Sequence, residues 1–167
     1  MTTRVAAETV RELVGQVADP EIPVLTIEDL GILREVAVDD RGHVEVTITP
    51  TYSGCPALDA IRDDVVRTLA EHGYADASVR TVLAPAWTTD WMSRAGHDKL
   101  AAFGIAPPGR RRPGPVPVPL TSAPGTVACP SCGSTDTREV SRFGSTACKA
   151  HWTCRACLEP FDHFKAL

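Results

Sequence analysis

The chain has 167 residues, of which 43% are hydrophobic, and a formal net charge of −4 at pH 7. This length suffices for one domain of ordinary size and a small module, and no apolar run approaches the ~18 residues of a membrane span. The negative charge is concentrated in residues 1–105, which carry 9 Lys/Arg and 17 Asp/Glu, whereas residues 126–167 carry 5 and 4. An acidic main domain argues against nucleic-acid binding, because that function needs cations that neutralise phosphates.

The first elements expected along the chain are one helix and two strands. Apolar residues recur at helical spacing over residues 4–17, which predicts an amphipathic helix that ends before Pro20. A segment of turns is expected over residues 19–31. Residues 32–39 and 44–49 then have the pattern of half-buried strands joined by a short hairpin loop.

A helix over residues 57–72, a strand over 77–83 and a short helix over 89–103 are expected to follow. Together these elements predict an α+β domain over residues 1–105, in which helices cover a small three-stranded sheet. Seven of the 14 prolines fall within residues 106–125. This composition predicts a semi-rigid linker of polyproline geometry.

The last forty residues hold two Cys-x-x-Cys pairs, formed by Cys129, Cys132, Cys154 and Cys157. A pair of thiolates at this spacing can hold a metal ion from one tight turn, and Gly133 supplies the open backbone that such a turn needs. Four thiolates favour tetrahedral zinc, although iron accepts the same ligands. Two disulfides or four buried thiols are the alternative. The spacing predicts a zinc-ribbon-like β module over residues 126–167 that depends on its metal for stability.

Three further residues of the tail carry donor atoms for a metal. Cys148 lies between the two pairs and would be a fifth thiol, while His151 and His163 could add imidazole ligands. Because four cysteines already satisfy zinc, we expect both histidines at the surface rather than at the metal.

Cys55 is the only cysteine outside the tail, and it lies at the amino-terminal end of the helix expected over 57–72. Unpaired backbone N–H groups and the helix dipole stabilise a thiolate there, so Cys55 could bind metal, carry a cluster or react with an electrophile. It could equally be a small buried apolar residue. Asp19, Glu21 and Asp29 could bring carboxylates near it, or they could act only as turn formers.

The sequence contains no nucleophile–base pair, phosphate-binding glycine loop, catalytic zinc motif or Rossmann fingerprint. We therefore do not expect catalysis by this chain alone. The amino terminus has no apolar segment of signal-peptide type, and the cysteines cluster as metal ligands rather than as a disulfide framework. These features predict a cytoplasmic protein in a reducing compartment.

Three motifs occur in order in the first part of the chain: Asp19-Pro20-Glu21, Asp29-Leu30-Gly31 and Thr51-x-x-x-Cys55-Pro56. In this order and spacing they resemble the metal-sulfur cluster assembly family that includes the SufT-like proteins. The resemblance implies that Cys55 is the residue most closely tied to cluster assembly. It also implies that Asp19 or Glu21 belongs to the family signature.

Three further segments, residues 85–93, 143–150 and 154–165, extend the match over nearly the whole chain. Together they make the chain similar to the PaaD (PaaJ) family of phenylacetate-degradation proteins, which accompany the multicomponent oxygenase (epoxidase) acting on phenylacetyl-coenzyme A. The resemblance implies an accessory role in maturing the iron or iron-sulfur centres of that oxygenase, with its oxygenase and reductase subunits and the iron-sulfur assembly machinery as partners. Cys148 lies within the 143–150 match, which implies a purpose for this thiol too.

Three other functions stay open. The chain could be a structural or regulatory subunit of the oxygenase, a nucleic-acid-binding zinc ribbon, or an oxidoreductase that cycles its Cys-x-x-Cys pairs between thiol and disulfide. The acidic main domain disfavours nucleic acid as a partner. One thiol is too few for an iron-sulfur cluster, so a cluster or iron held transiently by Cys55 would need a homodimer or ligands from a partner.

Overall fold

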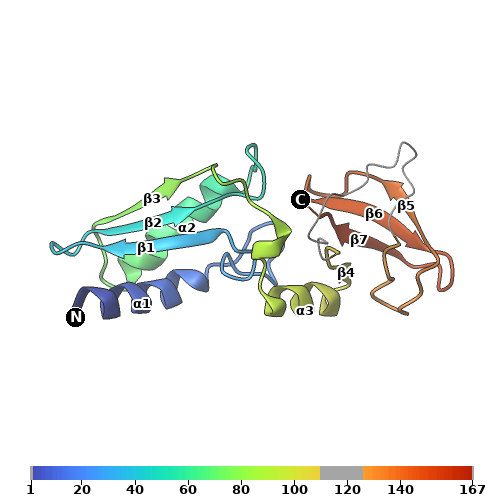
Figure 1. Ribbon diagram of the computed structural model, residues 1–167, viewed down its shortest axis with the longest axis horizontal. Coiled ribbons are helices and arrows are strands. Elements are labelled where there is room, and N and C mark those ends of the chain that lie inside the picture. Colours follow the sequence, from blue (N-terminus) through green and yellow to red (C-terminus); the bar gives the residue numbers. More distant parts are fainter. Residues whose placement is uncertain (1, 110–125, 167) are drawn as a thin grey trace. The chain divides into compact units, whose positions relative to one another are not determined.

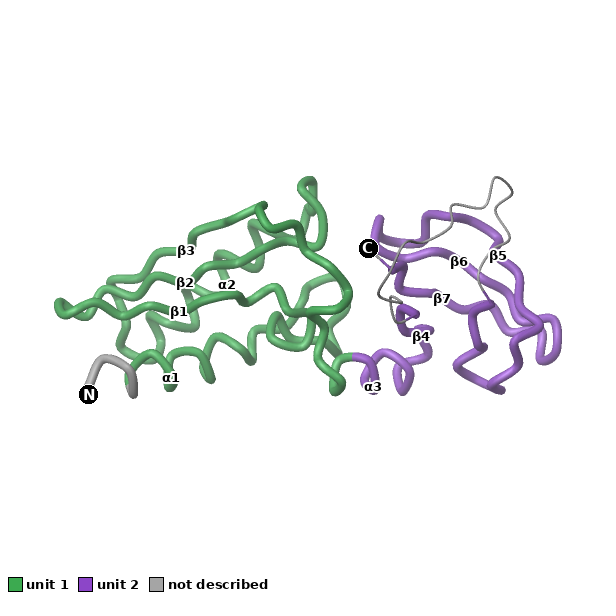
Figure 2. The backbone as a smooth tube through the Cα atoms, viewed as in Figure 1, with its two compact units in different colours: residues 1–96 green, residues 97–167 purple. Residues whose placement is uncertain are grey.

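The computed structural model describes residues 2–109 and 126–166, so most of the predicted proline-rich linker lies outside the described residues. The chain forms two compact units, residues 1–96 and 97–167 (Figure 2). The predicted α+β architecture, with a helix-covered three-stranded sheet and a carboxyl-terminal cysteine-rich strand module, is confirmed. No helix in the described ranges is long and apolar enough to cross a membrane.

The first unit contains two long helices and a three-stranded sheet (Figure 1). Its elements are α1 (Thr2–Gly15), β1 (Leu33–Val38), β2 (Val44–Ile48), α2 (Leu58–Glu71) and β3 (Ala77–Thr81). β2 pairs antiparallel with β1 and parallel with β3, so α2 is the crossover of a β-α-β unit. α1 packs on β1 and on α2, and α2 packs on β3, which places both helices on one face of the sheet.

The core of the first unit lies between these helices and the sheet. Val44, Val46 and Ile48 of the central strand β2 are fully buried, in agreement with their predicted alternation. The helices contribute five further side chains that are at most 1% exposed: Val10, Val14, Ile61, Val65 and Leu69. Burying each such side chain contributes about 1.5–3 kcal/mol, so aliphatic packing is a principal source of stability in this unit.

The second unit is built on a four-stranded sheet in the order β4-β7-β6-β5. The strands are β4 (Ile105–Ala106), β5 (Thr137–Ser141), β6 (Lys149–Cys154) and β7 (Pro160–Phe164), and α3 (Arg94–Ala102) precedes them. β4 runs parallel to β7, while the other pairs are antiparallel. The buried cluster of this unit is small and includes two cysteines: Ala106, Cys129, Ala150, Trp152, Cys154 and Phe161.

The single helix predicted over residues 89–103 is wrong. A short 3-10 helix, η1 (Thr89–Trp91), is followed by two non-helical residues before α3 begins. The backbone N–H of Ser93 donates to the Asp29 carbonyl at 2.8 Å, and the Ser93 Oγ accepts from the Gly96 N–H at 2.9 Å. Ser93 therefore both caps α3 and ties the chain to a distant loop, which interrupts the helical run.

Candidate functional site

The three motifs of the first unit and its Trp-rich segment lie at one end of the three-stranded sheet. Because β2 and β3 are parallel and β1 is antiparallel to β2, the segment before β1 meets the segments after β2 and β3 there (Figure 1). These segments carry Asp19 and Asp29, Cys55, and Trp87 and Ser93, respectively. The carboxyl ends of parallel strands are where open sheets bind ligands. We call this region, formed by residues 16–32, 49–57 and 82–93, the motif end of the sheet.

Cys55 lies in a turn immediately before α2. Its N–H donates to the Tyr52 carbonyl at 3.2 Å, and its own carbonyl accepts from the Leu58 N–H at 3.2 Å. Its side chain is half-buried, and the thiol forms no disulfide with any cysteine that the structure describes. Cys55 is therefore partly accessible, and its role as a functional thiol stays a prediction.

Asp19 is buried and holds the turn in which Glu21 lies. Its Oδ1 accepts from the backbone N–H groups of Glu21 at 2.9 Å and Ile22 at 2.8 Å. Such an Asx turn is the turn-forming role that the sequence left open for this residue. A shared site of Asp19, Glu21 and Cys55 stays a prediction.

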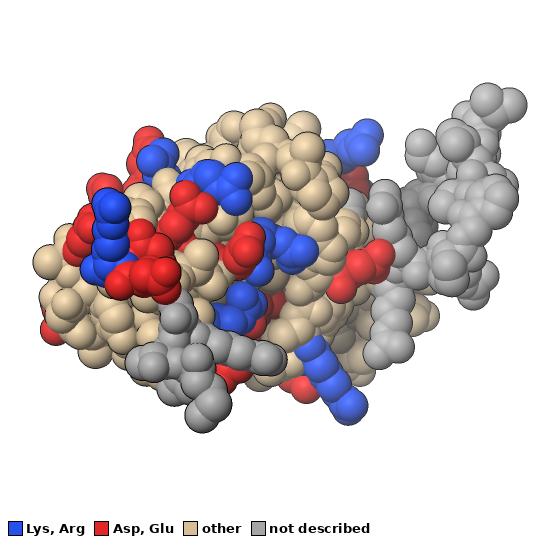
Figure 3. Space-filling model, turned by 60° about the vertical axis from the view of Figure 1, so that its left-hand side comes forward, with Lys and Arg blue, Asp and Glu red and all other residues tan. Residues whose placement is uncertain are grey.

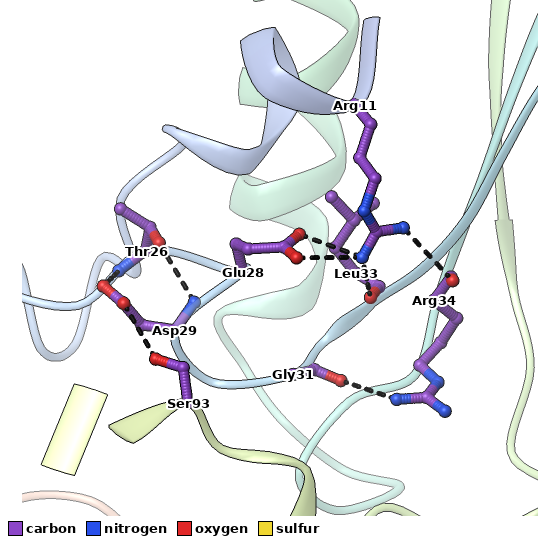
Figure 4. Close-up of polar contacts among 8 residues, drawn as sticks. All are labelled: Arg11, Thr26, Glu28, Asp29, Gly31, Leu33, Arg34 and Ser93. Atoms are coloured by element: carbon purple, nitrogen blue, oxygen red, sulfur yellow. Dashed lines mark hydrogen bonds and ion pairs between the residues drawn. The ribbon is translucent and has the colours of Figure 1, made fainter. Parts of the chain in front are cut away.

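The Asp29 carboxylate joins two segments of the motif end (Figure 4). Its Oδ2 accepts from the Thr26 N–H at 3.1 Å, while the Thr26 Oγ1 accepts from the Asp29 N–H at 3.1 Å. The other carboxylate oxygen, Oδ1, accepts from the Ser93 hydroxyl at 3.1 Å. Asp29 is thus a buried connector between the loop before β1 and the segment after β3, and Ser93 is a partner that sequence reasoning missed.

The next two motif residues contact the same segment after β3. The carbonyl of Leu30 accepts from the buried Trp87 Nε1–H at 2.9 Å. Gly31 has a φ of 69°, and a Cβ at this position would lie 2.3 Å from the Trp91 carbonyl oxygen. Arg34 donates to the Gly31 carbonyl at 3.4 Å and stacks 3.6 Å from the centre of the Trp91 ring. The Asp29-Leu30-Gly31 motif therefore fixes the backbone of the motif end.

The arginines of the first unit that are paired with carboxylates include Arg11, Arg67 and Arg80. Arg11 of α1 binds Glu28 at 2.9 and 3.1 Å (Figure 4), and Arg80 lies 3.3 Å from Glu45. The face drawn in Figure 3 likewise shows blue and red side chains intermingled. A nucleic-acid interface would instead gather unpaired cations on one face.

In the second unit, the sulfurs of the four predicted ligands lie together. All four Sγ atoms are within 4.8 Å of one another: Cys129, Cys132, Cys154 and Cys157. Two of the separations join the two Cys-x-x-Cys turns, at 3.8 Å between Cys129 and Cys157 and 3.6 Å between Cys132 and Cys154. Zinc–sulfur bonds of ~2.3 Å at tetrahedral angles require sulfurs about 3.8 Å apart. The cluster therefore has the spacing of a tetrahedral metal site with four protein ligands.

The pKa values of these thiols also indicate that the cluster is suited to bind a metal cation. The Cys157 N–H donates to the Cys154 Sγ at 3.5 Å, and this bond lowers the pKa of the Cys154 thiol to about 7. A hydrogen bond from the Glu159 backbone lowers the pKa of Cys157, but burial and the neighbouring sulfurs raise it to about 12. Crowded thiolates repel one another, so all four can ionise at neutral pH only around a positive ion.

The other candidate donors of the tail lie outside this cluster. Cys148 is buried, and its sulfur is 3.0 Å from the Thr146 hydroxyl. His151 pairs with Asp162 at 3.4 Å, while His163 is half-buried and packs edge-on against Trp152. In the described ranges, the metal-binding cluster consists of the four cysteines alone.

Two family models match the chain, and together they cover both units. The model of the iron-sulfur cluster assembly protein family matches residues 7–81, which include the Asp19, Asp29 and Cys55 motifs. The model of the PaaD zinc beta ribbon domain matches residues 113–165, which include the four-cysteine cluster. The chain therefore combines an iron-sulfur cluster assembly domain with a metal-binding ribbon.

The chain is 43% identical over 155 residues to an Escherichia coli K12 protein that is named as one of the subunits of a "Putative 1,2-phenylacetyl-CoA epoxidase", covering 93% of this chain and 90% of that protein. It is 39% identical over 88 residues to the "Fe-S protein maturation auxiliary factor YitW" of Bacillus subtilis 168, covering 52% of this chain and 85% of that protein. A crystal structure of a domain of unknown function, DUF59, from Bacillus anthracis matches with a TM-score of 0.57 and 27% identity, covering 60% of this chain and 95% of that one.

Proposed function

Because the chain belongs to the PaaD family, in which an iron-sulfur cluster assembly domain precedes a zinc beta ribbon, we propose that it is an accessory maturation factor. Its targets are the iron or iron-sulfur centres of the multicomponent phenylacetyl-CoA oxygenase (epoxidase) of aerobic phenylacetate degradation. The names of two relatives support this: one is named as a subunit of that epoxidase and the other as an Fe-S maturation factor. None of the six cysteines, all of which the structure describes, forms a disulfide, which suits a cytoplasmic, reducing location.

The observation that carries the proposal is the position of Cys55 at the motif end. A half-buried thiol lies in the turn before α2, which begins at Leu58. The N–H groups and the dipole of a helix start are a general means of stabilising a thiolate. Thiolate is the ligand type that iron-sulfur clusters use. The cluster or iron would be cargo here, because one thiol supplies too few ligands to retain it. The missing ligands come from the recipient protein or from a second copy of this chain.

We propose zinc as the metal of the four-cysteine cluster. The residues fit, because four thiolates at tetrahedral spacing form a closed site with no open coordination position, as in structural zinc sites. Zinc supplies folding energy there and no redox chemistry. The second unit is then a zinc-stabilised docking module for the oxygenase and reductase subunits, and Cys55 is the working thiol.

Complementation of cells that lack the protein tests the proposal, with Cys55→Ser and the control Ser53→Ala compared. Ser53 is exposed in the same turn, so both changes are equally mild structurally. We expect oxygenase activity and the cluster content of its reductase to be lost in Cys55→Ser and retained in Ser53→Ala. Normal activity in Cys55→Ser would contradict the proposal. Together with stoichiometric co-purification, it would indicate a structural component of the oxygenase instead.

A further inference from the structure

The second unit contains an open cleft of about 510 Å³ that is separate from the four cysteines. Its floor includes Ala106, Trp152 and His163, from the adjacent strands β4, β6 and β7. Ala106 pairs with His163, and Trp152 pairs with Phe161, two residues before His163. All three floor residues therefore point to the same face of the sheet. The volume is within the range of small-molecule sites.

The floor of the cleft is aromatic and uncharged. Trp152 is 3% exposed, and the His163 ring packs edge-on against it with centroids 5.8 Å apart. Burial lowers the pKa of His163, so its imidazole is neutral at pH 7. Within the described residues, the buried Trp152 Nε1–H has no hydrogen-bond acceptor. This surface suits the apolar part of a ligand.

Two cations and one carboxylate line the cleft, namely Arg142, Lys165 and Glu139. Lys165 is oriented by a 3.0 Å hydrogen bond from its Nζ to the Arg142 carbonyl and by the Phe143 ring, 4.7 Å away. The Arg142 guanidinium forms no ion pair with the residues that the structure describes. The described residues that line the cleft thus carry one net positive charge, and among them the Arg142 guanidinium is available to an anion.

We propose that this cleft binds a small anion with an apolar body. Its carboxylate or phosphate group contacts Arg142 and Lys165, and its apolar part lies on Trp152 and His163. Arginine suits this role because its guanidinium donates two parallel hydrogen bonds to either oxyanion. This ligand site is distinct from the metal cluster and from Cys55, and the maturation role does not require it.

Titration of the full-length, zinc-loaded chain tests the site by NMR, with hexanoate and hexyl phosphate as separate probes. Hexanol and hexylamine have the same body without the anion. We expect a saturable shift of the Trp152 indole N–H, assigned with Trp152→Phe, and no shift of the Trp87 indole N–H, which is bound to Leu30. The oxyanion that gives the lower Kd identifies the preferred headgroup. No saturable shift with either anion below about 10 mM would overturn the proposal.

Three variants test the charge arrangement. Arg142→Gln should weaken anion binding about tenfold, because a charge-assisted hydrogen bond is lost. Arg138→Gln is the matched control on strand β5, since Arg138 is exposed and does not line the cleft. Glu139→Gln should strengthen binding, because it removes the opposing carboxylate. Equal binding of hexylamine and hexanoate, or an unchanged Kd in Arg142→Gln, would contradict the proposal.

Discussion

The two units of the chain use sulfur and apolar packing in opposite ways. In the first unit, buried aliphatic side chains of α1, α2 and β2 form the core, and its one cysteine, Cys55, is half-buried in a loop. In the second unit, two of the four clustered cysteines, Cys129 and Cys154, are themselves part of a small core. Cysteine sulfur is therefore part of the core in the second unit, although Cys132 and Cys157 of the same cluster are exposed, and it lies outside the core in the first unit.

This difference is the basis of the proposal that one chain holds one metal firmly and binds another transiently. Four thiolates at tetrahedral spacing close around an ion, whereas a single thiolate leaves most coordination positions to other molecules. The core of the first unit is aliphatic and does not include Cys55, so we expect replacement of this thiol to leave the unit folded. Substitutions in one unit or the other should therefore differ in how much they destabilise that unit.

The largest effect should follow loss of the ribbon metal. Cys154→Ser removes a buried ligand, and metal binding contributes about 10–16 kcal/mol in comparable zinc modules, enough to unfold the second unit. Amide NMR signals of β6 should collapse while those of β2 persist. Cys55→Ser serves as the control and should keep both sets. Loss of the β2 signals in Cys154→Ser would show that the first unit also depends on the metal for its folding.

Gly31→Ala should destabilise the first unit strongly. The new Cβ would lie 2.3 Å from the Trp91 carbonyl oxygen at a positive φ, so we expect a loss of about 3 kcal/mol. Gly42→Ala is the matched control, because its φ of 85° is similar but nothing lies within 4 Å of the added Cβ. Its cost should be about 1 kcal/mol. Urea unfolding measures both, and equal losses would refute the proposed contact.

Trp87→Phe should have a smaller effect, also confined to the first unit. It removes the Nε1–H that donates to the Leu30 carbonyl and leaves a buried acceptor unsatisfied, at a cost of about 1–2 kcal/mol. Trp91→Phe retains a ring for Arg34 to stack on and should cost less. The unfolding midpoints in urea give the comparison. A greater loss in Trp91→Phe would reverse the roles assigned to the two tryptophans.

The smallest effect concerns pH. A hydrogen bond from His43 to Asp76 raises the pKa of His43 above 6.5, so the folded first unit favours the protonated imidazole. This stabilisation is complete below the unfolded pKa and is lost as pH rises through the folded pKa. Unfolding of the wild type between about pH 6 and about pH 8 should therefore show a steeper fall in stability than unfolding of His43→Gln. Identical pH dependence of stability in the two proteins would show that His43 does not stabilise the folded unit in this way.

Most of the first unit follows from local patterns in the sequence. The alternation of β2 and the helical periodicity before Pro20 are short-range signals, and the structure confirms both elements. The interruption at Ser93 was not predictable, because its cause is hydrogen bonding to Asp29, 64 residues earlier. Strand β4 was missed for a similar reason, since two residues carry no period and only pairing with β7 defines them.

The four-cysteine cluster and the motif end also differ in how far local sequence patterns predict them. The spacing of the four tail cysteines was sufficient to predict that their sulfurs would meet, because each pair is held by its own turn. At the motif end, no local pattern indicated that Asp29 would bind Ser93 or that Leu30 would bind Trp87. Those contacts join segments brought together only by the order of the strands.

Metal analysis with a visible spectrum tests the division of labour between the two units most directly. It is made on wild type and Cys55→Ser after anaerobic purification and again after incubation with ferrous iron and sulfide. We predict about one zinc ion per chain in both proteins as purified, without colour. After incubation, a second copy of the chain should supply the missing ligands, so that iron and visible absorption appear in the wild type and are absent in Cys55→Ser. Iron and colour that persist in Cys55→Ser would place the cluster on the tail cysteines and contradict this division of labour.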